Sequence, residues 1–213
     1  MTLTAAAANK GGFAYNHLPQ VLAAWYIFIW IALAISPLDR GDWLLENILA
    51  LATVGLLLAT YHKFQFSNLS YVLITLFMTL HAIGAHYTYS EVPLGFWMKE
   101  ALGLSRNHFD RIVHFAFGFL LAYPAYELFR RAAGTKGAWA AFFAITAVLS
   151  LSGLFEVIES WVAQIVSPEL GQAYLGTQGD IWDAQKDMTL ACVGAILAIG
   201  LTLALPKIRR PEK

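Results

Sequence analysis

Two pairs of ionisable residues occur at helical spacings within apolar stretches of this chain. Asp110 and His114 are four residues apart, and Glu156 and Glu159 are three apart, so a helix would place each pair on one face. Imidazole combined with carboxylate suits zinc, manganese or iron, whereas carboxylates alone suit magnesium or calcium. Two carboxylates one helical turn apart repel each other unless a cation or a proton lies between them. These residues therefore favour a metal-binding or proton-holding site.

Further acidic and imidazole side chains can join the same site. Asp180, Asp183 and Asp187 follow one another at spacings of three and four, which keeps them on one face if their helix starts early. His81 and His86 are five residues apart, about 140° around a helix. His81 is therefore the better inward candidate, and His86 is expected nearer the mouth of a pocket.

Each group also has a structural interpretation. Acidic residues favour the first turn of a helix for electrostatic reasons alone, and Glu46 is consistent with such capping. Arg106 and Arg111 can hold an anion such as phosphate, or they can equally pair with neighbouring acids. The predicted catalytic residues are Asp110, His114 and Glu156; the predicted metal ligands are His81, Glu156, Glu159, Asp183 and Asp187; the predicted secondary pocket comprises Glu46, His86, Arg106, His108, Arg111 and Asp180.

The composition predicts that these residues are carried by a membrane protein. The chain has 213 residues, of which 58% are hydrophobic and 13% charged, against about 25% charged in soluble domains. A membrane-crossing helix needs about 20 mostly apolar residues. We therefore expect an all-α polytopic bundle of six transmembrane helices, with a kink at Pro124 and a turn-rich loop over 167–180. The six expected helices cover 21–37, 44–61, 69–87, 112–129, 138–165 and 188–206.

The distribution of lysine and arginine predicts the orientation of the bundle. With both termini in the cytoplasm, nine of the 14 basic residues lie inside, including Arg130 and Arg131. Twelve of the 14 acidic residues then belong to the outer half, together with His81, His86 and His114, as well as His108. A charged group at mid-bilayer costs roughly 2.5–3.5 kcal/mol on insertion scales, so these residues should face the bundle interior. We expect a disordered cytoplasmic tail over 1–16, a membrane domain over 17–206 and a basic tail over 207–213.

Several classes of function are disfavoured by the sequence. The formal net charge is zero, which argues against nucleic-acid binding. Cys192 is the only cysteine, so neither an internal disulfide nor a thiolate metal cage can form. The chain has no His-Glu-x-x-His zinc helix, no Gly-x-Ser-x-Gly elbow and no glycine-rich nucleotide loop.

Four longer motifs resemble known membrane proteins. DWLLEN at 42–47, HYTY at 86–89, SRNHFDRIVHF at 105–115 and GTQGDIWDAQKD at 176–187 resemble the YjdF family of bacterial inner-membrane proteins, and the similarity runs from about residue 20 to 205. This resemblance implies a multi-pass protein of the bacterial inner membrane and carries no activity. More distantly, DRIVHF at 110–115 and GDIWD at 179–183 look like signature stretches of VanZ-like membrane proteins, which implies a link to the cell envelope.

Three functions are compatible with these residues. The first is a membrane metalloenzyme that uses a divalent metal (Zn, Mn or Mg) to hydrolyse a lipid-linked or envelope substrate. The second is an ion- or proton-coupled transporter, for which internal repeats and broken helices would be expected. The third is a non-catalytic envelope-binding protein. The expected partners are the lipid bilayer and such a substrate, with no nucleic acid.

Overall fold

The computed structural model describes residues 17–205, and these form helices joined by short connections. The described helices, in chain order, are α1 His17–Ala34, α2 Arg40–Thr60, α3 Asn68–Tyr87, the 3₁₀ helix η2 Tyr89–Glu91, α4 Pro93–Leu102, α5 Phe109–Arg131, α6 Ala138–Ile165, α7 Pro168–Leu175 and α8 Asp183–Ala204. Six of them are long and apolar enough to cross a membrane. The predicted all-α polytopic bundle is confirmed. The tails predicted over 1–16 and 207–213 lie outside the described residues.

The observed helices extend further into polar sequence than the apolar stretches indicate. Helices α2, α5 and α8 start at Arg40, Phe109 and Asp183, ahead of the expected starts at 44, 112 and 188. Each has an acidic residue in its first turn, where the positive end of the helix dipole favours it. Helix α1 stops at Ala34 instead of continuing to 37, because the residue before a proline avoids the helical region.

The turn-rich loop expected over 167–180 is partly wrong, since Pro168–Leu175 is helix α7. The hydroxyl of Ser167 accepts the backbone N–H of Leu170 at 3.3 Å, and Pro168 occupies the first turn, where its missing N–H costs nothing. Ser167 and Pro168 are therefore a helix start signal, although the glycines that follow them indicated a loop. Helix α5 runs through Pro124 as one helix.

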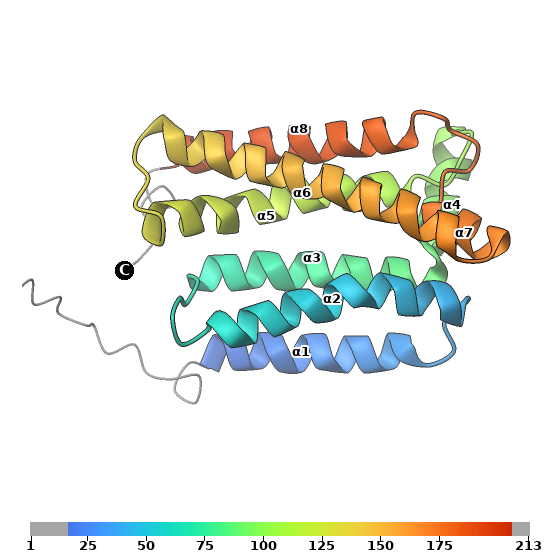
Figure 1. Cartoon of the computed structure of the whole chain (residues 1–213), viewed down its shortest axis with the longest axis horizontal. Helices are drawn as coiled ribbons and strands as arrows, with labels where there is room; N and C mark the ends of the chain where they lie inside the picture. The colour runs from blue at the N-terminus through green and yellow to red at the C-terminus, as the bar shows by residue number, and fades with distance from the viewer. Residues whose placement is uncertain (1–16, 206–213) are drawn as a thin grey trace, which may run out of the picture.

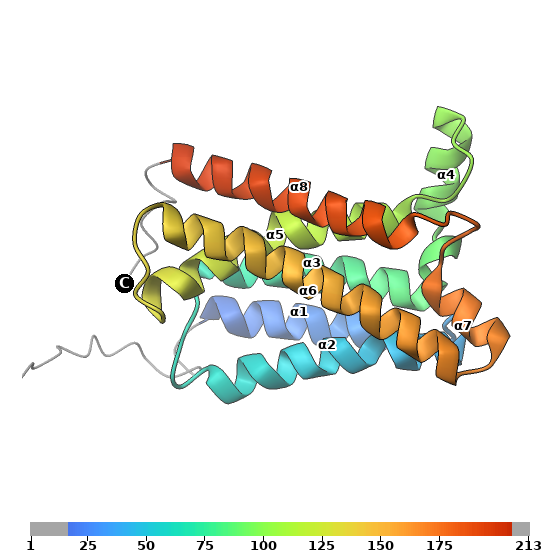
Figure 2. The ribbon, with the colours of Figure 1, turned by 45° about the horizontal axis from the view of Figure 1, so that its top comes forward.

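The six long helices lie side by side in two groups (Figures 1 and 2). One group is α1, α2 and α3, and the other is α5, α6 and α8; α3 packs against α5 and joins them. Helix α7 closes one end of the bundle and contacts both α2 and α6. Helix α4 stands across the direction of the long helices at that same end (Figure 2).

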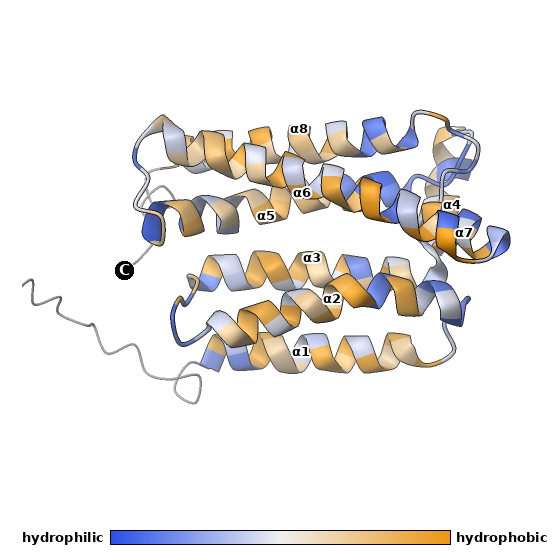
Figure 3. Cartoon of the chain, in the orientation of Figure 1, coloured by the Kyte–Doolittle hydropathy of each residue, from blue (hydrophilic) through white to orange (hydrophobic). Residues whose placement is uncertain are grey.

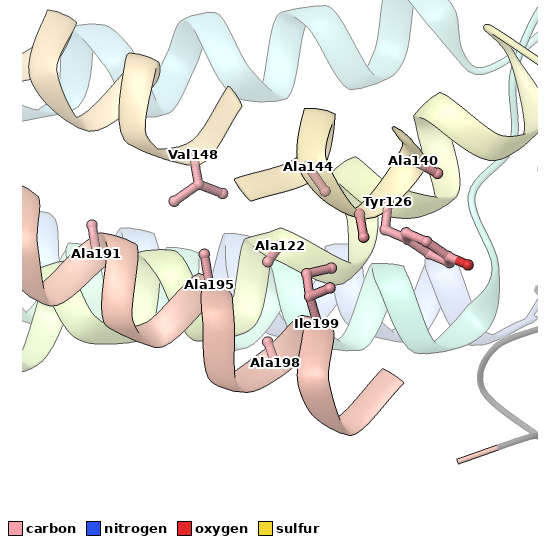
Figure 4. Close-up of a cluster of buried hydrophobic side chains, with 10 residues drawn as sticks. Ala122, Tyr126, Ala140, Ala144, Val148, Ala191, Ala195, Ala198 and Ile199 are labelled. Carbon is pink, nitrogen blue, oxygen red and sulfur yellow. The ribbon is translucent and has the colours of Figure 1, made fainter. Parts of the chain in front are cut away.

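The second group is held together by small side chains. Alanines at 122, 144, 191 and 195 are fully buried among α5, α6 and α8 (Figure 4). A Cβ on Gly118 would lie 1.8 Å from the backbone oxygen of Ala191, and one on Gly194 would lie 2.4 Å from that of Phe115. Helices α5 and α8 therefore approach backbone to backbone, as small residues allow in membranes. This contact fixes the relative depth of residues on the two helices.

The two ends of the bundle differ in polarity. Figure 3 shows hydrophilic segments at the ends of α2, α6 and α8 that lie beside α7 and α4. At the opposite end Glu127 is fully buried and accepts hydrogen bonds from the Ser67 N–H at 2.8 Å, from the Ser70 hydroxyl at 2.5 Å and from Arg131. This buried carboxylate is satisfied and ties α3 to α5, so the unsatisfied acidic groups belong to the α7 end.

Candidate functional site

An acidic cavity of about 340 Å³ opens at the α7 end of the bundle. Helices α5, α6 and α8 and the connection between α7 and α8 form its walls. The carboxylates that line it belong to Asp110, Glu156, Glu159, Asp180, Asp183 and Asp187. All six were expected at one end of the membrane domain, and the structure brings them to one cavity.

Asp110, His114 and Asp187 form the tightest group at this cavity. One ligand atom from each lies within 4.8 Å of the others. The Nε2 of His114 is 3.4 Å from the Asp110 Oδ1 and 3.7 Å from the Glu156 Oε1. Asp187 is 2% exposed, and its Oδ1 accepts no hydrogen bond from the described residues. Because a buried, unpaired carboxylate oxygen is costly, this atom is available to a ligand.

Asp183 has a different environment from Asp187. Both its carboxylate oxygens accept hydrogen bonds from the guanidinium of Arg106, and a further nitrogen, from Arg111, lies 3.2 Å from its Oδ1. Arg106 also donates to the backbone oxygens of Thr177 at 2.9 Å and Gly176 at 3.1 Å. Asp183 thus neutralises the buried Arg106 and, with it, anchors the α7–α8 connection to the segment before α5.

Asp180 completes this ion-pair network at its solvent edge. It accepts hydrogen bonds from Lys186 at 2.6 Å and from Arg111, and the Lys186 ammonium is the main cause that holds the pKa of this carboxyl well below its usual range. Arg111 also donates to the Nδ1 of His108 at 3.3 Å. Desolvation, followed by the Arg111 charge, lowers the pKa of His108 below its ordinary value. Of the two alternatives for Arg106 and Arg111, the structure shows pairing with acids.

His81 lies away from the Asp110, His114 and Asp187 group, beside Glu46 and Tyr89. Its Nε2 donates to the backbone oxygen of Glu46 at 3.2 Å, and its Nδ1 is 2.5 Å from the Tyr89 hydroxyl. Glu46 is 3% exposed, and its Oε2 accepts no hydrogen bond from residues 17–205. His86, one and a half turns later on α3, faces elsewhere and bonds the backbone oxygen of Leu33 at 2.8 Å.

Two tyrosines and one aspartate near these carboxylates were not predicted from the sequence. Tyr89 and Tyr174 line a small cavity that adjoins the acidic one, and Asp42 is 1% exposed with both carboxylate oxygens unbonded within the described chain. Tyr89 belongs to the HYTY motif and Asp42 to the DWLLEN motif. Their place in these motifs was therefore a signal from which both residues could have been predicted as site residues. Tyr174 carried no such signal, because its segment was expected to be a loop.

Comparisons with known proteins agree with this architecture. Residues 18–207 match the family described as "Predicted membrane protein (DUF2238)". The chain is 38% identical over 172 residues to "Inner membrane protein YjdF" of Escherichia coli (strain K12), an alignment that covers 80% of this chain and 82% of that protein. No solved structure matches. The predicted resemblance to the YjdF family is confirmed, and the chain belongs to the DUF2238 family of membrane proteins.

Proposed function

We propose that this protein is a metal-dependent hydrolase of the bacterial inner membrane that acts on a lipid-linked or envelope ester or phosphoester. Asp110, His114 and Asp187 would hold the metal ion. The observation that carries this proposal is the convergence of one imidazole and two carboxylates within 4.8 Å, one of them with a buried oxygen that no described residue bonds. The proposal takes both termini to be cytoplasmic, as the distribution of lysine and arginine predicts, so that the cavity would face outward.

The donor set fits a divalent transition metal. One imidazole with carboxylates suits zinc or manganese better than magnesium, which prefers oxygen alone. Helices α5 and α8 supply the three ligands, and the backbone contact at Gly118 and Gly194 holds these helices in register. A rigid pair of elements of this kind is what a preorganised metal site requires.

The remaining cavity residues fit a hydrolytic role. A bound divalent metal supplies Lewis acidity and lowers the pKa of a coordinated water. Glu156 lies beside His114 and lines the cavity with Glu159, so both carboxylates are placed to accept or return a proton. The volume of about 340 Å³ is within the range of small-ligand pockets, about 300–1,000 Å³, and accommodates a head group.

Apolar side chains at the same end support a substrate with a lipid portion. Ile181 lines the cavity and is 85% exposed, and the adjacent Trp182 is 59% exposed. Helix α4, which stands across the bundle (Figure 2), exposes Leu94 and Trp97. Exposed tryptophan and aliphatic side chains suit the membrane interface. The acidic cavity would therefore open at the level of lipid head groups.

The transporter alternative is less well supported. Each of the six long helices among residues 17–205 is continuous, whereas transporters often place a broken helix at the binding site. The small-residue core of Ala144, Ala191 and Ala195 packs tightly among α5, α6 and α8. Cation flux in proteoliposomes that disappears on Glu156→Gln substitution would favour transport instead. A non-catalytic envelope-binding role would predict ligand binding without turnover.

The metal site is tested by zinc binding to the purified full-length chain in detergent. We expect about one high-affinity Zn²⁺ per chain, and we expect Asp187→Asn to weaken its affinity at least about tenfold, since even outer-shell changes cost this much. Glu100→Gln, which neutralises an exposed carboxylate on α4, is the matched control and should bind as the unaltered chain does. Equal zinc affinity in D187N and the unaltered chain would contradict the proposal.

The hydrolytic activity is tested separately. Membranes that contain the protein should release the head group from a lipid-linked phosphoester, and both a chelator and D187N should abolish the release. If zinc binds at Asp187 but no ester or phosphoester is cleaved, then the metal site stands and the hydrolase assignment fails.

A further inference from the structure

The six carboxylates of the acidic cavity differ in what balances their charge. Four of them pair with arginines or would hold the proposed metal ion; they belong to Asp110, Asp180, Asp183 and Asp187. The two that remain are Glu156 and Glu159, one turn apart on α6. No lysine or arginine among residues 17–205 forms an ion pair with either of them. Their charge therefore has to be balanced by another group.

Both glutamates are largely shielded from solvent. Glu159 is 9% exposed, and the Glu156 Oε1 is buried without a hydrogen bond from the described chain. Their carboxyl groups lie within hydrogen-bonding reach of each other. Two carboxylates this close repel unless a proton or a cation lies between them. His114, 3.7 Å from Glu156, is shared with Asp110, so the pair can accept a further positive group.

This positive group is better supplied by an organic ammonium than by a second metal ion. Among residues 17–205, the set of three with ligand atoms close enough to share a metal ion is Asp110, His114 and Asp187, and it does not include Glu159. An ammonium group has three N–H donors, and each donor can meet a separate carboxylate without a closed shell of ligands. Glu156 and Glu159 therefore suit an ammonium.

We propose that the head group of the substrate carries a primary ammonium, as an ethanolamine phosphodiester does, and that Glu159 binds this ammonium together with Glu156. The phosphodiester part of this assignment rests on the proposed function, whereas the ammonium site does not require hydrolysis. An anionic head group would bring a further negative charge beside these carboxylates, so the cavity would select against it. Glu156, which also lies beside His114, remains placed to transfer a proton.

The arrangement of the helices allows one head group to meet both sets of side chains. Helices α5 and α8 carry the proposed metal ligands, and α6 carries the two glutamates. All three helices line the same cavity of about 340 Å³, a volume within the range of small-ligand pockets. The phosphate would lie toward the metal group and the ammonium toward Glu159.

Binding of deacylated head groups to the purified full-length chain in detergent tests this inference. Glycerophosphoethanolamine and glycerophosphoglycerol share a phosphodiester, but only the first has an ammonium. By titration calorimetry, with and without zinc, we expect the first to bind at least about tenfold more tightly, because its ammonium gains hydrogen bonds to charged groups. Glu159→Gln should remove this difference. Glu100→Gln, at an exposed carboxylate of α4, is the matched control and should keep it.

A third probe keeps the test valid if Glu159→Gln perturbs folding. Glycerophosphocholine retains the positive charge but has no N–H donor, so it should bind the unaltered chain more weakly than glycerophosphoethanolamine does. Equal affinities for the ethanolamine and glycerol probes, including no binding of either, would overturn the ammonium site. So would a preference that persists in a folded E159Q variant.

These affinities are measured without turnover, so they separate this inference from the proposed function. If both diesters are cleaved but bind equally well, the hydrolase assignment stands and the ammonium site fails. If the ethanolamine probe is preferred, through Glu159, and no ester or phosphoester is cleaved, the ammonium site stands and the hydrolase assignment fails.

Discussion

Arg106 and Asp183 form the most buried ion pair near the cavity, with side chains only 7% and 6% exposed. Desolvation of both groups is costly, and their mutual attraction repays it only with good geometry and additional hydrogen bonds. The backbone oxygens of Thr177 and Gly176 provide those additional acceptors for Arg106. The pair therefore secures the α7–α8 connection, which forms one wall of the acidic cavity.

Asp183→Asn should destabilise the protein without removing the metal ion proposed at Asp110, His114 and Asp187. Loss of one charge from a buried pair costs about 3–5 kcal/mol because the remaining arginine is uncompensated. Thermal unfolding in detergent should show a clearly lower midpoint for D183N, whereas Glu91→Gln, at an exposed carboxylate, should leave it unchanged. If D183N lost zinc at an unchanged midpoint, Asp183 would be a ligand, as the sequence predicted.

Spacing alone could not assign the partners of Asp180, Asp183 and Asp187. Their separations of three and four residues predicted a shared face, and all three do line one cavity. Which of them meets an arginine depends on how the 105–111 segment lies against α8, and only the tertiary structure gives that. The pairing of Asp110 with His114, by contrast, follows directly from their positions within one helix.

At the level of helices, the approach of α5 to α8 determines the geometry of the proposed metal site. Asp110 and His114 lie on α5 and Asp187 on α8, so any change in helix separation alters the distances between these ligands. Gly194 faces the α5 backbone, whereas Gly200 on the same helix has open space around it. This difference provides a matched pair of substitutions.

Gly194→Ala should weaken both the fold and zinc binding. The added methyl would overlap the Phe115 backbone oxygen, and overpacking of this kind costs typically 1–3 kcal/mol. Gly200→Ala should leave stability and zinc affinity unchanged or slightly improved, because alanine favours a helix over glycine. Thermal unfolding and zinc titration of both variants check this. An unaffected G194A would mean that α5 and α8 are not in backbone contact.

The apolar stretches predicted the existence of six long helices but not their ends. The apolar stretch is shorter than the helix that contains it, because a polar first turn such as that of α8 is still helical. The close contact of α5 and α8 was not predictable, since the glycines at 118 and 194 resemble those at 55 and 200 until a neighbouring backbone is placed beside them. Helix α7 was predictable in principle from Ser167 and Pro168.

At the scale of the molecule, one end carries the acidic cavity and the other carries the satisfied Glu127 cluster. The excess of lysine and arginine near the Glu127 end predicts that this end is cytoplasmic, in which case the cavity would face the periplasm. Lys136 lies in the connection between α5 and α6, and Ile181 lies at the cavity. These two positions therefore report on opposite sides of the membrane.

Single-cysteine labelling tests this orientation. After Cys192, the one native cysteine, is replaced by alanine, cysteine introduced at Ile181 should react in intact cells with a maleimide that enters the periplasm but not the cytoplasm. Cysteine introduced at Lys136 should react only after the cells are lysed. The reverse pattern would show that the cavity faces the cytoplasm, and it would exclude an envelope substrate.

The ion pairs that bridge the 105–111 and 176–187 segments join residues 77 and 69 positions apart. During synthesis Arg106 and Arg111 leave the ribosome long before Asp183 and Asp180 do, so two membrane-crossing segments must be inserted around guanidinium groups that have no acid to meet. These ion pairs can form only after the segment that carries Asp180 and Asp183 has been synthesised. A nascent chain stalled before α8 would consequently hold Arg106 and Arg111 without these acidic partners at the start of α5.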